Sequence, residues 1–456
     1  LTPWGFDDYE TSGPEPHGSN PDNLGAHRDP GFADNVIGFF EEKAGQGDGK
    51  PWFAVASLVN PHDIAAYPFP FFLPGQGGVT GLTAPLHLPQ KLPAKGTIST
   101  PDSKGGTTEL NPGGFPQNCF DLPPTFAESL AGKPDCHLDS AWKVQTALAS
   151  IFPEQVQGLL PYPTQTLGPL QESWARHYGQ FYVYLQYLMD LELDRIFKAF
   201  DASGLSEDTI VVFTSDHGEY AMAHGQMLQK WYTAYEESVR VPLVVSSPLI
   251  NPDRDRIQEV FQPTSHIDLA PTLLGLAGFG EAERQEIRQR IGGHGVVRDF
   301  VGLDLSSALL GGATLPRPGV LFTTHDDVTR TAVGVAEPEK QAQFDSFLTN
   351  VDDLIKRRAP LSPGPVVEPN AVHMLCTGDW KLNRYYDPAG VEDDQWELYH
   401  LTSDPNEVAN LVDFRSGLLV PGSVVPGLNA QQLEAQRVLL RAQLADQERQ
   451  LLLTPV

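Results

Sequence analysis

Basic side chains and long apolar runs are both scarce in this chain. Its 456 residues include 31 Lys and Arg against 58 Asp and Glu, which gives a formal charge of −27. A surface this acidic repels polyanions, so we expect no nucleic-acid partner, and an anionic substrate must meet local positive charge. No run of about 18 apolar residues occurs, so we expect no membrane-spanning helix.

Cysteine is scarce as well. Cys119, Cys136 and Cys376 form neither a metal-spaced cluster nor an even set, which argues against a zinc site and against a disulfide framework. A Cys119–Cys136 pair remains open in an oxidising compartment, but we expect isolated thiols.

Short apolar runs predict a sheet in the first part of the chain. Residues 51–59, 209–214 and 240–246 are rich in β-branched or apolar residues and too short for helices. Between the first two, apolar residues repeat at three- and four-residue steps from Tyr178 to Phe200, which predicts a helix that ends before Gly204. A helix that leads into a strand is the unit of a parallel sheet. We therefore predict an α/β fold whose mixed, mostly parallel sheet is flanked by helices.

The last part of the chain has a different pattern. Residues 380–386 and 395–401, joined by a turn at 387–390, predict antiparallel strands, and residues 429–452 predict a closing helix. We place a domain boundary near Leu315, with a catalytic α/β domain over 1–315 and a smaller α+β domain over 316–456. Residues 68–169, rich in Pro, Gly, Thr and Ser, predict an irregular region beside the site.

The most informative stretch follows the strand at 209–214. Asp216 and His217 stand where this strand ends, so a carboxylate and an imidazole can reach one divalent cation there. Gly218 allows a sharp turn, and Lys230 can fold back as a point charge for an anionic oxygen. The competing interpretation is that Asp216 caps a helix and that His217 faces solvent.

Several motifs resemble those of the sulfatases, a family of the alkaline phosphatase superfamily. The resemblance rests mainly on Ser215-Asp216-His217-Gly218-Glu219, His224-Gly225, Lys230, and Tyr235-Glu236-Glu237-Ser238-Val239-Arg240-Val241-Pro242. Further landmarks along the chain are similar: Gly5-Phe6-Asp7, Asn60-Pro61-His62-Asp63, Ile267-Asp268-Leu269-Ala270-Pro271-Thr272, Glu397-Leu398-Tyr399 and Asp404-Pro405-Asn406-Glu407.

The resemblance implies an alkaline-phosphatase-like fold and a set of site residues. Asp216 and His217 would bind a divalent cation, with Ca²⁺ expected and Mg²⁺ or Mn²⁺ as alternatives. Lys230 and His62 would contact the sulfate oxygens, and His224 is a weaker candidate for contact with substrate.

Two further residues and one short segment have weaker signals. Glu219 and Arg240 are expected to be structural, whereas residues 325–327, which follow a strand predicted at 319–324, are a weak candidate for substrate contact.

The chain departs from the family at the nucleophile. The family's Asp-Asp pair, its Cys-x-Pro-Ser-Arg motif, whose cysteine becomes formylglycine, and its Lys-Trp-His segment have no counterpart among these residues. The simplest account is that they precede Leu1. We therefore expect formylglycine in a missing N-terminal part and predict that this chain is inactive alone.

The activity that the resemblance implies is hydrolysis of a sulfate ester, on a small molecule or a glycan, to an alcohol or phenol plus sulfate. Two alternatives stay open: a phosphonate or phosphate ester hydrolase of the same superfamily, and a noncatalytic anion- or glycan-binding remnant. Oligomeric state has no signal in the sequence.

Overall fold

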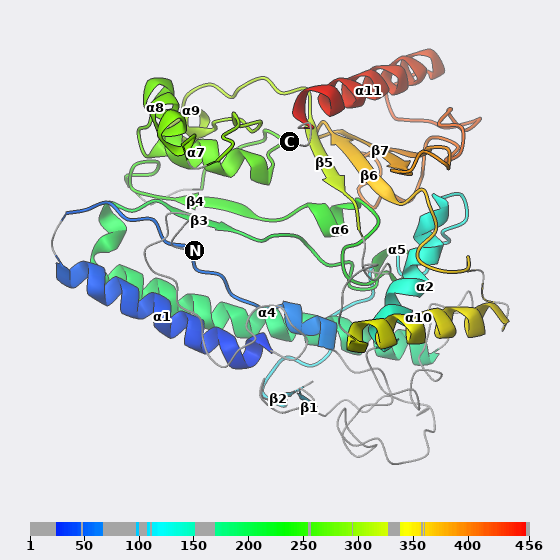
Figure 1. Ribbon diagram of the computed structural model, residues 1–456, viewed down its shortest axis with the longest axis horizontal. Coiled ribbons are helices and arrows are strands. Elements are labelled where there is room, and N and C mark those ends of the chain that lie inside the picture. The colour runs from blue at the N-terminus through cyan, green and yellow to red at the C-terminus, as the bar shows by residue number, and fades with distance from the viewer. Residues whose placement is uncertain are drawn as a thin grey trace.

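The computed structural model describes residues 24–46, 49–66, 97–99, 107–109, 112–150, 169–253, 257–293, 295–326, 338–356, 359 and 361–452. Figure 1 shows helices α1 (Gly25–Gln46) and α4 (Pro169–Ser203) side by side along one edge of the molecule. The C-terminal sheet and helix lie at the opposite corner, and a two-stranded ribbon runs between these parts.

Helix α4 confirms the prediction from apolar periodicity and starts earlier than predicted. Its buried face includes Phe181, Leu185, Ile196 and Phe200, each at most 6 % exposed. Ile196 and Phe200 pack against α1. The helix is followed by Gly204 in the left-handed region, as helix C-termini commonly are.

The strands β3 (Val211–Thr214) and β4 (Leu243–Ser246) confirm two predicted strands but correct their direction. They pair antiparallel, with Thr214 opposite Leu243. The predicted parallel arrangement is wrong for this pair because the connection between them contains no crossover helix. Its helices, α5 (Ala223–Gln226) and α6 (Glu236–Val239), have four residues each.

The strand predicted at 51–59 is not formed. These residues are extended but have no ladder partner among the described residues. Phe53 is 64 % exposed and Val55 is 66 % exposed, so the predicted burial of this segment on both faces is wrong as well.

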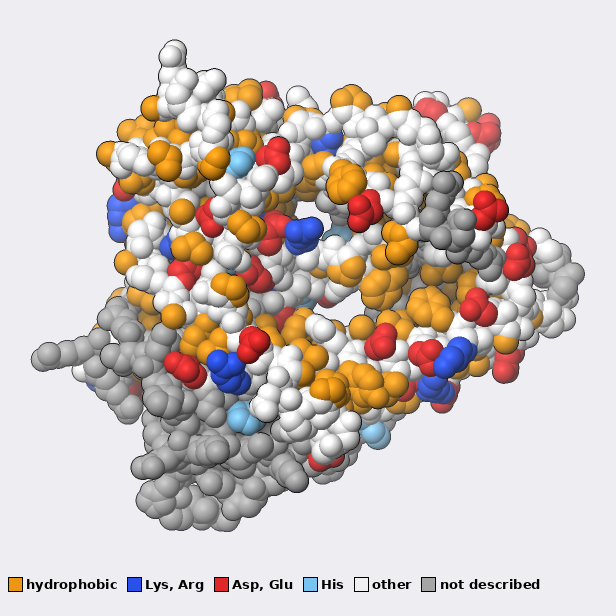
Figure 2. Space-filling view, turned by 180° about the vertical axis from the view of Figure 1, so that it is seen from behind, with side chains coloured by type: hydrophobic (Ala, Val, Ile, Leu, Met, Phe, Trp, Pro, Cys, Tyr) orange, Lys and Arg blue, Asp and Glu red, His pale blue; other side chains and the backbone are white. Residues whose placement is uncertain are grey.

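Apolar side chains of β4 are exposed too, and Val244 is 54 % exposed. On the face that Figure 2 shows, hydrophobic side chains gather around a hollow near the centre.

The C-terminal part is an antiparallel sheet covered by a helix. Strand order is β5 (Val320–Thr324), β6 (Ala371–Cys376), β7 (Trp380–Tyr386) and β8 (Gln395–His400). The predicted pair is confirmed, with β7 and β8 in antiparallel register. This sheet, together with α11 (Ala430–Leu451), forms the smaller α+β part that the sequence predicts. The boundary near Leu315 stays a prediction.

Leucines of α11 hold it on the sheet. Leu433, Leu440 and Leu444 are at most 2 % exposed and share a core with Trp380 and Trp396.

The region predicted to be irregular contains an unpredicted helix, α2 (Asp135–Ser150), whose Cys136 is fully buried. Much of the rest of 68–169 lies outside the described residues. All three cysteines are free, as expected. None of the helices in the described ranges is long and apolar enough to cross a membrane.

The remaining elements complete the described chain. They are η2 (His62–Ala66), β1 (Thr97–Ser99), β2 (Thr107–Glu109), η4 (Leu205–Glu207), η5 (His266–Asp268), α7 (Leu269–Leu276), α8 (Glu281–Ile291), α9 (Ser306–Leu309) and α10 (Pro338–Lys356). The landmark motif at residues 267–272 lies in η5 and α7.

Candidate active site

Asp216 and His217 follow the end of β3, and their geometry suits a cation. His217 Nδ1 lies 2.8 Å from the Gly218 carbonyl oxygen. Because a carbonyl can only accept, Nδ1 carries a proton, and Nε2 is the ring nitrogen that faces away from this bond. That Nε2 lies 3.2 Å from Asp216 Oδ2. An imidazole nitrogen and a carboxylate oxygen this close can be ligands of one ion, so the donor types of the pair fit a divalent cation.

These two side chains alone would not make a complete metal site. In the described part of the chain, no group of three or more His, Cys, Asp or Glu side chains could hold a metal ion. Ca²⁺ takes six to eight oxygen ligands, so most positions would fall to water or to other groups. Asp216 is accordingly open, with its side chain 82 % exposed.

Gly218 lies where another part of the chain approaches closely. Its amide donates to the Ser238 carbonyl at 2.8 Å. A Cβ atom at this position would stand 1.9 Å from the Glu237 carbonyl oxygen. This close approach is the reason that residue 218 must be glycine. The sequence alone explains the glycine by a sharp turn instead.

His62 is positioned by two aspartates that join its loop to α1. Asp63 accepts hydrogen bonds from the amides of Gly25 and Ala26, at 2.5 and 2.8 Å. These amides belong to the first turn of α1, where backbone donors lack helical partners. In return, Asp29 of α1 accepts from the amides of residues 59 and 60, at 2.7 and 3.0 Å.

Four predicted site residues share one electrostatic environment. The pKa of His62 is lowered to about 4, mainly by burial, with the ammonium group of Lys230 and the neighbouring His217 adding to the shift and Asp216 opposing it. His62 therefore lies within electrostatic reach of all three, although they come from distant parts of the sequence. At neutral pH its imidazole is uncharged.

Lys230 lies in a turn that two carboxylates hold. Glu219 accepts from the Gln229 amide at 2.7 Å and from the Tyr178 hydroxyl at 3.0 Å, which links the turn to α4. Asp326, after β5, accepts from the Tyr232 amide at 2.7 Å. Burial lowers the pKa of Lys230, against the opposing charges of Glu219, Asp216 and Asp326.

These contacts bear on the predictions that Glu219 is structural and that residues 325–327 contact substrate. Glu219 has the structural contacts expected of it. Asp326 is a sequence candidate for substrate contact, yet its carboxylate is occupied by the Tyr232 amide and by the Thr324 hydroxyl at 3.0 Å.

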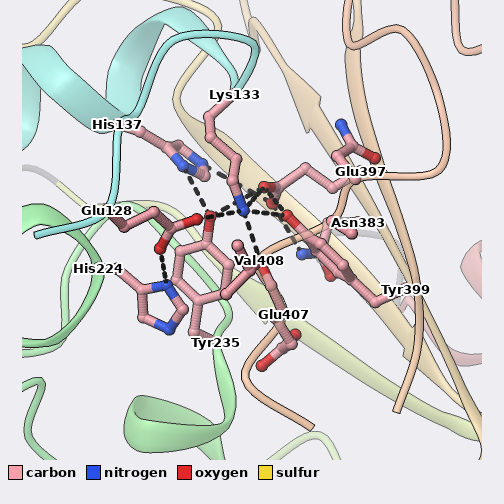
Figure 3. A network of polar contacts seen from close by, with 12 residues as sticks. Glu128, Lys133, His137, His224, Tyr235, Asn383, Glu397, Tyr399, Glu407 and Val408 are labelled. Carbon is pink, nitrogen blue, oxygen red and sulfur yellow. Dashed lines mark hydrogen bonds and ion pairs between the residues drawn. The ribbon is translucent and has the colours of Figure 1, made fainter. Parts of the chain in front are cut away.

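His224 is enclosed in the protein. It is fully buried, with Nδ1 at 2.8 Å from Glu128 and Nε2 at 3.1 Å from Glu237. Its ring stacks on that of Tyr235 at 3.7 Å (Figure 3 shows the surrounding network). With both nitrogens occupied, no polar atom remains for substrate. This arrangement argues against the predicted substrate contact of His224 and favours a structural role.

Two neighbours of the site have no functional signal in the sequence. His266 Nε2 lies 2.8 Å from the Ser215 carbonyl oxygen, directly beside Asp216. Tyr182 of α4 has a pKa raised to about 12, by burial and by the charges of Glu219 and Asp216. In the sequence, Tyr182 marks only the periodic face of a helix and His266 only a helix start, so neither could be singled out.

Comparison with known proteins identifies the family of this chain. The model of the Sulfatase family matches residues 4–279. Arylsulfatase K of Xenopus laevis is 29% identical over 372 residues, which are 81% of this chain and 50% of that protein. Arylsulfatase K of Gallus gallus is 27% identical over 266 residues, 58% of this chain and 39% of that protein. The chain thus spans half or less of the length of these curated relatives.

The fold has a counterpart among solved structures. The structure of a 2-O GAG sulfatase superposes with a TM-score of 0.52 at 18% identity, covering 99% of this chain and 71% of that one. This similarity confirms the predicted alkaline-phosphatase-like α/β fold with a small antiparallel C-terminal part. The family match covers more than half of the residues, and on that ground the chain belongs to the sulfatase family.

Proposed function

We propose that this chain supplies the cation- and sulfate-binding half of the active site of a sulfuric ester hydrolase. The observation that carries the proposal is that Asp216, His217 and Lys230 all lie close enough to the partly buried His62 to influence its charge. Asp216 and His217 suit a cation, and Lys230 and His62 suit an anion. A sulfate group beside a metal ion requires both kinds of partner.

Each residue has a role that follows from its contacts. Asp216 and His217 Nε2 would hold the divalent cation, for which Ca²⁺ is our first choice because a carboxylate and open water positions suit a hard ion. Such an ion, when bound, stabilises negative charge on nonbridging oxygens. Lys230 adds a half-buried ammonium group, and His62 offers an imidazole that can hydrogen-bond a sulfate oxygen.

The substrate that we propose is a sulfate ester of a small molecule or a glycan. The names of similar proteins support this class: besides the arylsulfatases, an ulvan-active sulfatase of Formosa agariphila is 36% identical over 113 residues, 25% of this chain. Formylglycine would have to come from outside residues 1–456, because no cysteine among them has the required sequence around it. We therefore expect the chain alone to be inactive.

Binding to the chain itself tests the site. Calorimetric titration with CaCl2 and then with sodium sulfate should show weak binding of both, with Kd values on the order of millimolar. Asp216→Asn should abolish calcium binding and Lys230→Met should abolish sulfate binding. Asp194→Asn, on an exposed part of α4, is the matched control and should change neither. No effect of D216N or K230M on either titration would refute the assignment.

Activity of a longer protein that contains this chain separates the reaction classes. Sulfate, phosphate and phosphonate monoesters of the same phenol would be compared at equal concentration. Preference for the sulfate ester supports our proposal. Preference for either phosphorus ester would assign the site to the related hydrolases, and binding without turnover would indicate a remnant.

A further inference from the structure

We propose that Lys381 and Glu407, from the C-terminal sheet and the turn that follows it, are positioning residues for Lys230. They act through a buried network of charges that holds residues 219–239, so the C-terminal part would be integral to the anion site. This inference rests on the proposed function, because that proposal gives Lys230 its role in binding sulfate. The network of contacts is observed in the structure and does not depend on that proposal.

The segment that carries Lys230 has an unusual backbone. Eight residues other than glycine have positive φ among the described residues, and six of them lie in this segment: Ala221, Met222, His224, Gln226, Gln229 and Tyr232. Each such conformation costs on the order of 1 kcal/mol or more, so it persists only where surrounding contacts impose it. A strained segment of this length needs strong external anchors.

The first anchor is the buried His224. It joins Glu237, inside the segment, to Glu128, which lies before α2. Glu128 in turn pairs with Lys133 at 3.1 Å. Lys133 donates to the Tyr399 hydroxyl of β8 at 2.7 Å, so the anchor reaches the C-terminal sheet (Figure 3).

The second anchor is Lys381 of β7. Its ammonium group is fully buried and lies 2.6 Å from Glu236 and 2.9 Å from Glu407. It also donates to the Ala234 carbonyl at 3.0 Å. Glu407 completes the contact by accepting from the Glu236 amide at 2.7 Å. Residues 234–236 are thus held through both backbone and side chains.

A short chain of hydrogen bonds leads from this anchor to the site. The Ser238 hydroxyl donates to the Lys230 carbonyl at 3.1 Å, and the Ser238 carbonyl accepts from the Gly218 amide at 2.8 Å. Ser238 therefore touches the backbone on both sides of the site, next to His217 and at Lys230. A displacement of 234–238 would move both the lysine and the cation ligands.

The network is better suited to fixing geometry than to adding stability. Buried ion pairs often contribute little net stabilisation, because desolvation offsets their attraction, whereas removing one partner leaves an uncompensated charge. The double substitution Lys381→Met with Glu407→Gln removes the pair without leaving such a charge, and Glu236 keeps Arg240 at 3.9 Å. This variant can therefore fold while lacking the ion pairs of the second anchor and the hydrogen bond from Lys381 to the Ala234 carbonyl.

The test combines amide hydrogen exchange with titration of inorganic sulfate in the presence of CaCl2. In K381M/E407Q we expect the amides of 218–239 to exchange at least about tenfold faster, while those of β6, β7 and β8 stay protected. We expect the affinity for sulfate to fall by about tenfold. Leu444→Ala is the control, since Leu444 is 1 % exposed in the core beneath α11 with Trp380 and Leu382, and Lys381 between them points to the other face of β7. It should lower global stability without changing sulfate affinity.

The outcomes separate the two proposals. If the unsubstituted chain binds no sulfate, the proposed function fails, and the exchange data alone decide whether the network holds the segment. If the amides of 218–239 stay protected from exchange in K381M/E407Q, the positioning role is refuted. It is also refuted if these amides lose protection only together with the whole C-terminal sheet, as expected for a general loss of stability in L444A.

Discussion

At the scale of single residues, Gly218 gives the sharpest stability prediction. Gly218→Ala would push a methyl group to within 1.9 Å of the Glu237 carbonyl oxygen, so the two segments must separate. We expect a loss of about 2–4 kcal/mol in the free energy of unfolding, measured with urea. Gly38→Ala is the control, because Gly38 is exposed in α1 with no atom near the added Cβ, and it should stabilise slightly. Equal effects at both sites would contradict the close approach.

His224 predicts a pH dependence of stability. Burial opposes its charge, but hydrogen bonds to Glu128 and Glu237 raise its pKa from 6.5 to about 9. Because the pKa is higher in the folded state, the contribution of charged His224 to folding stability is complete below pH 6.5 and is lost as the pH rises through 9. Between these limits, the stability of the unsubstituted chain should fall relative to His224→Gln by about 3 kcal/mol, measured by urea unfolding. A constant difference between the two proteins would contradict a charged His224.

At the scale of elements, the start of α1 should control the loop of His62. Asp63→Ala leaves the Gly25 and Ala26 amides without acceptors, which should cost about 2–4 kcal/mol of unfolding free energy and weaken sulfate binding. Asp34→Ala is the matched control on the same helix. Its side chain is 66 % exposed and pairs with Arg195, so we expect a change below about 1 kcal/mol and unchanged sulfate binding. Unchanged sulfate affinity in D63A would show that α1 does not position His62.

The elements also show how far local patterns reach. Helices α4 and α11 and the β7–β8 pair follow from periodicity and turn residues, because their pattern repeats within a few residues along the chain. Helix α2 was missed because its setting is rich in turn formers and its buried face contacts distant segments. The antiparallel pairing of β3 with β4 depends on the path of the intervening loop, which no local pattern records.

At the scale of the whole molecule, the charge of −27 predicts a salt effect. Like charges repel one another in the compact state, and salt screens exposed charges much more than buried ones. Raising NaCl from about 10 to about 200 mM should therefore increase the free energy of unfolding by about 1 kcal/mol, measured as a higher urea midpoint. The buried pairs of Lys381 should be little affected. A decrease with salt would show that surface ion pairs outweigh the repulsion.

The sequence by itself determined the acid and imidazole at the end of a strand, the lysine that follows, and the family to which these motifs point. Neighbours in sequence must stay neighbours in space, so Asp216 and His217 needed no fold to be placed together. Only the tertiary structure decided that His62 lies partly buried within electrostatic reach of them, that His224 is enclosed by carboxylates, and that Lys381 lies against Glu236. Such contacts join residues far apart in the chain, and their energy exists only once folding has removed the side chains from water.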